Sequence, residues 1–210
     1  MADETFHANR LFESRRHDLI HLLLDFGWWD DDLEAGEVLS TYNKKLALRL
    51  FSMGWNPCRE NQLAESLNWT RNYAPIAGIV KELVKLDPER IRPQLDMALA
   101  GEIRDRNLSK ARSLLHMGAR KKWKAVEIEQ QGFRRGHPLW EAIHTGRAKF
   151  WNLFELDYSD VDPVYLLKFA LSEGNDEVFD SMVAGFRRYG QLDDMTDQAV
   201  RFEVERALAD

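Results

Sequence analysis

The segment LLHMG at residues 114–118 decides the fold, because its pattern of two apolar residues, any residue, one apolar residue and then Gly or Asp recurs along the chain. The other copies are LLDFG at 23–27, LFSMG at 50–54, LVKLD at 83–87, LFELD at 153–157 and the weaker SMVAG at 181–185. The last residues of successive copies are 27, 33, 31, 39 and 28 positions apart. A period of about 30 residues indicates stacked helical repeats.

Each copy has the properties of a short helix that packs on one side and then stops. Apolar residues at positions i, i+1 and i+3 lie on one stripe of a helix and face another element. The Gly or Asp that follows ends the helix, since glycine adopts the left-handed conformation without a Cβ clash. A unit of this length cannot bury its own stripe, so we expect several units to stack into one continuous core.

Helix patterns cover most of the chain, whereas no alternating strand pattern is flanked by a tight-turn dipeptide. Pro163 follows Asp162, which is typical of an N-cap and the first helical position. The final polar segment predicts a helix that caps the stack. We expect helices with breaks over residues 3–24, 39–53, 138–156 and 163–185, and the capping helix over residues 194–209.

The most informative unit is GHPLWEAIHTG at residues 136–146, followed by RAKFWNLFEL at 147–156. It resembles an ankyrin repeat, which has a Thr-Pro-Leu-His turn, a short inner helix that ends at Gly, and an outer helix with a Leu pair. His137 stands in place of the family's Thr, and Trp140 in place of its His. The following unit agrees, because Ala170 and Gly174 repeat the spacing of residues 142 and 146.

The resemblance is best over about residues 95–190, and it implies an all-α, ankyrin-like solenoid of about six irregular helix pairs. The chain is then a single helical-repeat domain, 1–210. Within it we expect divergent helical repeats over 1–94, ankyrin-like repeats over 95–190 and a C-terminal capping helix over 191–210. Residues 102–107 have the character of an insertion between an inner and an outer helix.

The composition excludes several classes of protein. With 44% apolar residues and seven Trp the chain can bury a core, whereas its single cysteine, Cys58, can form neither an internal disulfide nor a Cys-rich zinc site. The acidic N-terminus is unlike a signal peptide, and no run of about 18 apolar residues predicts a membrane span. We therefore expect a cytoplasmic protein without membrane contact.

The net charge of −6 is unevenly distributed along the chain. Residues 1–99 hold 12 basic and 16 acidic side chains, residues 100–150 hold 12 and 5, and residues 151–210 hold 5 and 14. A basic middle between acidic flanks indicates a polarised surface, which bears on partners rather than on the fold. The basic segment 104–149 is therefore a candidate interface.

Within that segment, RKKWK at residues 120–124 follows the predicted helix stop at Gly118 and is expected to be a loop. Lysine and arginine bind phosphates, and an aromatic ring among them stacks on a base. An acidic protein would use the same charges, and in a third interpretation Trp123 packs on a helix beside a solvated loop. The candidate contact residues are Arg120, Lys121, Lys122, Trp123, Lys124, Arg134 and Arg135.

A second candidate site is the segment WWDDD, which follows Gly27. Two exposed Trp beside three acids would form a hot spot for a basic partner, and Trp55 holds the equivalent position after Gly54. Alternatively, the Trp pair closes the N-terminal end of the core while the acids cap the next helix. The candidate residues are Trp28, Trp29, Asp30, Asp31, Asp32 and Trp55.

Signals of catalysis are weak. His17 and His21 have the spacing of metalloprotease zinc ligands, but Asp18 stands where that motif has Glu and no third ligand is evident. Cys58 lies beside Arg59, whose charge favours a thiolate, yet no partner base can be identified. There is no phosphate-binding loop, nucleophile elbow or dinucleotide fingerprint. We therefore expect no catalytic residue, metal site or cofactor.

The resemblance implies scaffolding or inhibition of another protein, because the family has no reaction of its own. We expect a protein–protein interaction module for a specific partner, of the kind that serves as a bacterial or phage inhibitor in immunity or counter-defence. The alternatives are nucleic-acid binding through residues 104–149 and, from the histidine spacing, a metal-dependent hydrolase. Exposed Trp side chains also leave a homodimer open.

Overall fold

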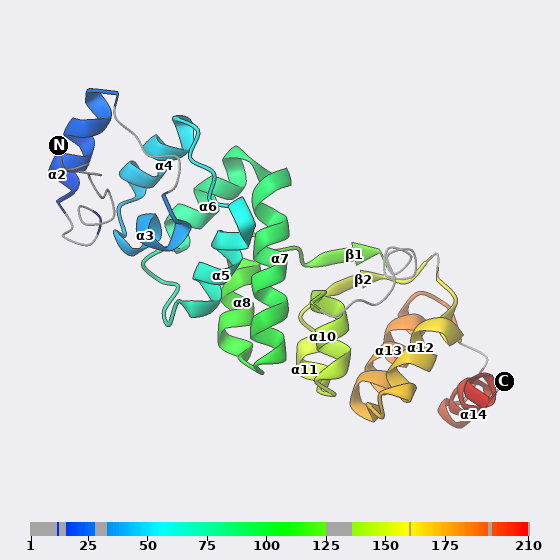
Figure 1. Ribbon diagram of the computed structural model, residues 1–210. Coiled ribbons are helices and arrows are strands. Elements are labelled where there is room, and N and C mark those ends of the chain that lie inside the picture. Colours follow the sequence, from blue (N-terminus) through cyan, green and yellow to red (C-terminus); the bar gives the residue numbers. More distant parts are fainter. Residues whose placement is uncertain are drawn as a thin grey trace. The chain divides into compact units, whose positions relative to one another are not determined.

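Helices dominate the structure, a computed structural model (Figure 1). It describes residue 12 and residues 16–27, 33–124, 136–159, 161–192 and 195–209. The chain divides into two compact units: residues 1–98 with 116–118 form unit 1, and residues 99–115 with 119–210 form unit 2. The helices α7 (Pro88–Arg104) and α8 (Leu108–Met117) contribute to both units. Within the described residues, no helix is both long and apolar enough to cross a bilayer.

Unit 1 is built from short helices that pack in a repeating order. Its elements are α2 (His17–Asp25), α3 (Ala35–Ser40), α4 (Lys44–Ser52), the 3₁₀ helix η1 (Arg59–Asn61), α5 (Gln62–Trp69) and α6 (Ala77–Leu86). Helix α3 packs on α5, and α4 packs on α6 (Figure 1). Leu46 and Leu50 of α4 and Ile79 and Leu83 of α6 are spaced by about one turn and are fully buried, so they form the core of this layer.

Four copies of the recurring pattern end a helix, as the sequence predicts. Gly27, Gly54 and Gly118 follow α2, α4 and α8 and have positive φ angles of 76°, 110° and 124°. At Gly118 a Cβ atom would also lie 3.0 Å from a methyl carbon of Val84, so the position excludes a side chain twice over. The fourth copy ends α6 directly before Asp87.

For the other two copies the prediction is wrong. Helix α11 (Ala148–Trp151) stops before the segment LFELD, and Glu155–Asp157 forms a strand, β2. Gly185 lies inside α13 (Asp176–Arg188), and a Cβ atom there would lie 2.8 Å from the ring of Tyr158. The glycine at this position therefore permits close packing and does not terminate the helix.

The same tight turn joins the two helices of a pair at four places. Its first two residues are Thr41-Tyr42, Asp105-Arg106, Thr145-Gly146 and Glu173-Gly174, and the second of each has a positive φ of 54°, 59°, 68° and 70°. The following helix begins two residues after that position each time. These turns confirm the predicted breaks inside 39–53, 138–156 and 163–185. The insertion expected at 102–107 is instead the last turn of α7 followed by this turn.

Unit 2 contains further helix pairs and a small sheet. Its remaining elements are β1 (Lys122–Lys124), α10 (Pro138–His144), α12 (Pro163–Ser172) and α14 (Asp197–Ala209). Helix α11 packs on α10 and α13, and α12 packs on α13 and α14 (Figure 1). The predicted N-cap is confirmed, because Asp162 Oδ1 accepts the Val164 N–H at 2.9 Å. His137 caps α10 in the same manner through Nδ1, which accepts the Leu139 N–H at 3.3 Å.

One small sheet accompanies the helices, which otherwise agree with the predicted all-α class. Strands β1 and β2 pair in parallel, with Lys122 opposite Glu155 and Lys124 opposite Asp157. Each strand has three residues and only its central residue, Trp123 or Leu156, is buried. A strand this short shows a single apolar residue between two charged ones, which is too little for an alternating pattern to be recognised. The fold is therefore mostly helical with one small parallel sheet.

Candidate functional site

The basic segment predicted to be a loop is in part a strand. Trp123, at the centre of β1, is buried, and its Nε1 donates to the carbonyl oxygen of Arg120 at 3.1 Å. The guanidinium of Arg120 lies over the Trp123 ring at 4.2 Å, and the ring of His137 meets its edge at 4.7 Å. Trp123 therefore packs inside unit 2, and its ring is not available to stack on a base.

The lysines of this segment are exposed, but two of them have an acidic partner. Lys121 Nζ contacts Glu155 Oε1, and Lys122 Nζ lies 3.7 Å from Glu155 Oε2. The hydrogen bond from Lys121 is the main reason that the pKa of Glu155 is lowered, so this carboxylate stays charged. The parallel pairing of β1 with β2 thus offsets part of the positive charge that the sequence places here.

The second predicted site is only partly within the described residues. Trp28, Trp29, Asp30, Asp31 and Asp32 lie outside them, as do Arg134 and Arg135 of the basic segment. Trp55 is described and is only 1% exposed, and its Nε1 donates to the carbonyl oxygen of Leu33 at 2.9 Å. It is a core residue of unit 1, which leaves its ring no surface for a partner to contact.

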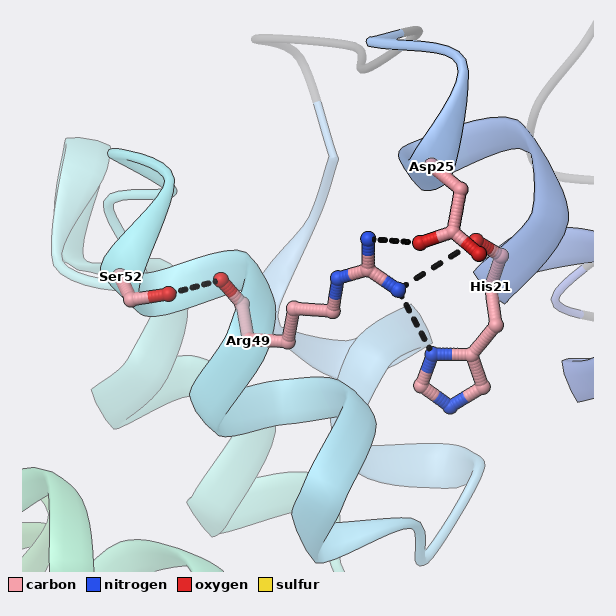
Figure 2. Close-up of polar contacts among 4 residues, drawn as sticks. All are labelled: His21, Asp25, Arg49 and Ser52. Carbon is pink, nitrogen blue, oxygen red and sulfur yellow. Dashed lines mark hydrogen bonds and ion pairs between the residues drawn. The ribbon is translucent and has the colours of Figure 1, made fainter.

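Polar contacts around His21, one member of the predicted histidine pair, join two helices (Figure 2). Arg49 of α4 donates through Nη2 to Asp25 Oδ1 at 2.5 Å and through Nη1 to the His21 carbonyl oxygen at 3.3 Å. The same Nη1 lies 3.4 Å from His21 Nδ1, and Ser52 Oγ donates to the Arg49 carbonyl oxygen at 2.7 Å. The side chain of His17 lies outside the described residues. These contacts assign His21 a part in holding α2 against α4.

The other two candidates for chemistry are the Cys58 thiol and a metal site. Burial raises the pKa of the Cys58 thiol to about 11, and Sγ donates to the Arg90 carbonyl oxygen at 3.4 Å. The thiol is therefore protonated near neutral pH. The described part of the chain contains no group of three or more His, Cys, Asp or Glu side chains placed to hold a metal ion.

A groove of about 800 Å³ lies in unit 1. It is formed by α3, α5 and the connection 70–76 between α5 and α6. Trp69, the last residue of α5, lines it and is 87% exposed, and Tyr42, just after α3, lines it and is 53% exposed. Two large aromatic rings at the surface of one groove are an unusual arrangement, since such rings are normally buried against protein.

The helical phase of α5 explains why Trp69 faces water. Leu63, Ala64 and Leu67 are buried and mark the side of α5 that faces the core. Trp69 follows Leu67 by two positions, or roughly 200° around the helix, and so lies on the opposite side. Its exposure is therefore a consequence of the helix register.

Local hydrogen bonds hold the walls of the groove together. Gln62 Oε1 accepts the Ala35 N–H at 3.3 Å and so links α5 to α3. Ser66 Oγ donates to the Gln62 carbonyl oxygen at 2.6 Å. A Cβ atom on Gly36 would lie 3.3 Å from Ser66 Oγ, so the two helices approach closely at this point. The groove is thus walled mainly by packed helices, and residues outside the helices, among them Tyr42 and several of residues 70–76, complete it.

Glu65 and Arg71 place opposite charges on the lining of the groove. Both side chains are exposed, and neither is within ion-pair distance of another charged group in the described residues. A partner with complementary charges can therefore contact them without displacing an internal ion pair.

This groove was not among the sites predicted from the sequence. The sequence signal that could have indicated it is Trp69, an aromatic residue on the polar side of an amphipathic helix.

Comparison of the chain with models of known families, with curated proteins and with solved structures finds no match.

Proposed function

We propose that the protein is a binding module of degenerate ankyrin-like repeats that holds a segment of a specific partner protein in the groove beside Trp69. The observation that carries this proposal is the Trp69 ring, which is almost fully exposed and lines the groove. Tryptophan is among the residues most enriched at binding hot spots, because its large apolar surface is removed from water on association. Scaffolding or inhibition of that partner is the role that the ankyrin-like resemblance implies.

The helix pairs support the repeat part of the proposal. In unit 1, first helices pack on first helices and second on second, as in α3 with α5 and α4 with α6. In unit 2, Asn175 follows a tight turn and donates through Nδ2 to the Ile143 carbonyl oxygen at 2.6 Å, which ties one pair to the preceding pair. A repeat protein binds through surfaces formed by several units, and the groove spans two of them.

The chemistry of the groove indicates the kind of segment it binds. An apolar side chain of the partner would be covered by Trp69 and Tyr42, and a basic and an acidic side chain would reach Glu65 and Arg71. Contacts of this kind combine an aromatic hot spot with charges at the rim, and the charges determine the register. We expect a short peptide segment to be sufficient for binding, because the groove holds only a few side chains.

The proposal is tested by capturing the partner with the full-length chain and two variants. Extract from the cells that produce the protein is passed over wild type, Trp69→Ala and Phe26→Ala, and the retained proteins are identified by mass spectrometry. Phe26 is the matched control, since it is 81% exposed in unit 1 and does not line the groove. We expect wild type and Phe26→Ala to retain one stoichiometric protein. Trp69→Ala should not retain it, because loss of the ring weakens binding by about 2 kcal/mol or more.

Retention of the same protein by Trp69→Ala, or no stoichiometric protein on the wild type, would contradict the proposal. The identity of the captured protein then decides whether the chain acts as an inhibitor in immunity or counter-defence.

Nucleic-acid binding through residues 104–149 is the competing function. The exposed side chains of Lys122 and Lys124 favour it, whereas the burial of Trp123 and the contacts of Lys121 and Lys122 with Glu155 weigh against it. Electrophoretic mobility of DNA and RNA at two salt concentrations separates the two functions, because phosphate contacts are strongest at low salt. We expect no shift at either concentration.

A further inference from the structure

A second opening, of about 470 Å³, lies in unit 2 and has a different chemistry. It is formed by the end of α11, by β2 and by α13. The side chains of Asn152, Tyr158, Ser181, Arg188 and Tyr189 line it. None of these residues belongs to the groove or to a site predicted from the sequence, so a ligand of this opening is independent of the proposed function.

Several side-chain donors of this opening have no acceptor among the described residues. Arg188 Nε donates to the Ala184 carbonyl oxygen at 3.2 Å, and no carboxylate of the described residues lies within ion-pair distance of its guanidinium. Ser181 Oγ donates to Asn152 Oδ1 at 2.8 Å. That bond occupies the amide oxygen, and no described residue accepts a hydrogen bond from Asn152 Nδ2.

Tyr158 adds a third donor. Its hydroxyl oxygen is hydrogen-bonded to the side chain of Trp151, whose indole nitrogen can only donate, so the phenol retains its own proton for another acceptor. Burial raises the pKa of Tyr158 to about 12, so the hydroxyl stays protonated at neutral pH. The absence of a Cβ on Gly185 gives the hydroxyl end of the ring its place in the wall, since a Cβ would lie 2.8 Å from the phenol oxygen.

The carboxylate on the lining does not cancel these donors. Glu155 is the acidic residue of the opening, and Lys121 and Lys122 both contact it, so two positive charges offset its one negative charge. An anion that enters the opening therefore meets Arg188 and a locally positive rim.

The size of the opening and its aromatic wall indicate a ligand larger than a bare anion. Openings of this volume hold small organic molecules, whereas a phosphate ion would fill only a fraction of the space. Tyr189 is half exposed, and its ring centroid lies 5.8 Å from that of Tyr158. A planar group between the rim and Tyr189 would extend this aromatic cluster.

We propose that this opening is a binding site for a small aromatic anion, that is, a planar ring that carries a carboxylate or a phosphate. The anionic group contacts the Arg188 guanidinium, the Tyr158 hydroxyl and the Asn152 amide, and the ring lies beside Tyr189.

Isothermal titration of the full-length chain with phenyl phosphate, benzoate and inorganic phosphate tests the proposal. We expect saturable binding of at least one of the two aromatic anions, and affinity for inorganic phosphate lower by about tenfold or more than that for phenyl phosphate. Arg188→Gln is expected to weaken binding of the aromatic anion by about tenfold or more, because a charge-assisted hydrogen bond is lost. The matched control is Arg112→Gln, an exposed arginine of α8 outside the opening, which should bind like wild type.

A second variant separates the ring from the charge. Tyr189→Leu keeps Arg188 and should reduce phenyl phosphate binding toward the level of inorganic phosphate. Three results would overturn the proposal: no saturable binding of either aromatic anion, equal binding by Arg188→Gln and wild type, or inorganic phosphate bound as tightly as phenyl phosphate. The affected side chains lie at the surface, and circular dichroism confirms that the variants are folded.

Discussion

The groove in unit 1 and the opening in unit 2 arise at two different departures from the regular helix pair. Four pairs are joined by the same three-residue turn, so that the second helix begins directly after the first. Helices α5 and α6 are joined by residues 70–76 instead, and the groove lies beside this connection. In unit 2, α11 has only four residues and gives way to β2, and the second opening lies there.

The two departures present different chemistry. The groove has exposed aromatic rings and serine and threonine hydroxyls that donate to helix carbonyl oxygens, whereas the opening in unit 2 has donors without an acceptor among the described residues, around a buried phenol. The first suits side chains of another protein, and the second suits a small anion. The regular pairs provide stability, and the irregular connections provide the surfaces where binding is proposed. Substitutions at matched positions can separate these two roles.

The largest expected effect separates two tryptophans of unit 1. Trp55→Ala should lower the free energy of unfolding by about 3–5 kcal/mol, because a fully buried ring and its hydrogen bond to Leu33 are lost. Trp69→Ala should change it by less than about 0.5 kcal/mol, since the ring is exposed. Urea unfolding followed by circular dichroism measures both. A comparable loss of stability in Trp69→Ala would mean that Trp69 supports the groove wall and does not serve only for binding.

The next effect separates two glycines that hold the same place in the regular turn. Gly146→Ala should cost about 2–3 kcal/mol of unfolding free energy, because the residue has a φ of 68° and the new Cβ would lie 2.5 Å from Asn175 Oδ1. The displaced Asn175 would also lose its bond to Ile143. Gly174 has a φ of 70°, but no atom lies within 4 Å of an added Cβ. Gly174→Ala should therefore cost only about 1 kcal/mol of unfolding free energy. Equal costs in thermal or urea unfolding would show that Asn175 does not couple the two pairs.

The regular turns explain how much of the fold could be predicted from sequence. A glycine after an apolar stripe ends a helix for local steric reasons, so Gly27, Gly54 and Gly118 were recognisable without any knowledge of packing. The cap at Asp162 is equally local. By contrast, a glycine is needed at position 185 because the ring of Tyr158, 27 positions away, packs against it. No local pattern distinguishes a glycine that ends a helix from one that permits close packing.

The candidate sites depend on long-range contacts and were harder to predict. The sequence shows aromatic residues at loop starts, but Trp55 and Trp123 are buried there while Trp69, at a helix end, is exposed. The difference lies in which neighbour covers each ring, and that is set by packing between helices. Charge was similarly misleading, because the partner of Lys121 is Glu155 on a strand 34 residues away.

A smaller effect compares two helical glycines. Gly185→Ala should cost about 1–2 kcal/mol, because the Cβ would overlap the Tyr158 ring and the gain in helix propensity offsets only part of that clash. Gly78→Ala in α6 has no atom within 4 Å and should instead stabilise unit 1 by up to about 1 kcal/mol. Differential scanning calorimetry measures both. If Gly185→Ala is also stabilising, the Tyr158 ring moves freely, and the wall of the opening in unit 2 is not fixed.

The smallest effect concerns α2, which polar contacts join to α4. Arg49→Met removes the contacts with Asp25 and His21 that Figure 2 shows. Because the Asp25 side chain is mostly exposed, the free energy of unfolding should fall by less than about 1 kcal/mol. We expect amide exchange over residues 17–25 to accelerate by up to roughly fivefold, with residues 62–69 unchanged. Lys45→Met, at an exposed position of α4, is the matched control and should leave exchange in α2 as it is. Faster exchange in α5 as well would mean that α2 and the groove unfold as one cooperative unit. Weaker binding by a groove variant would then reflect unfolding of α2 as well as a lost contact.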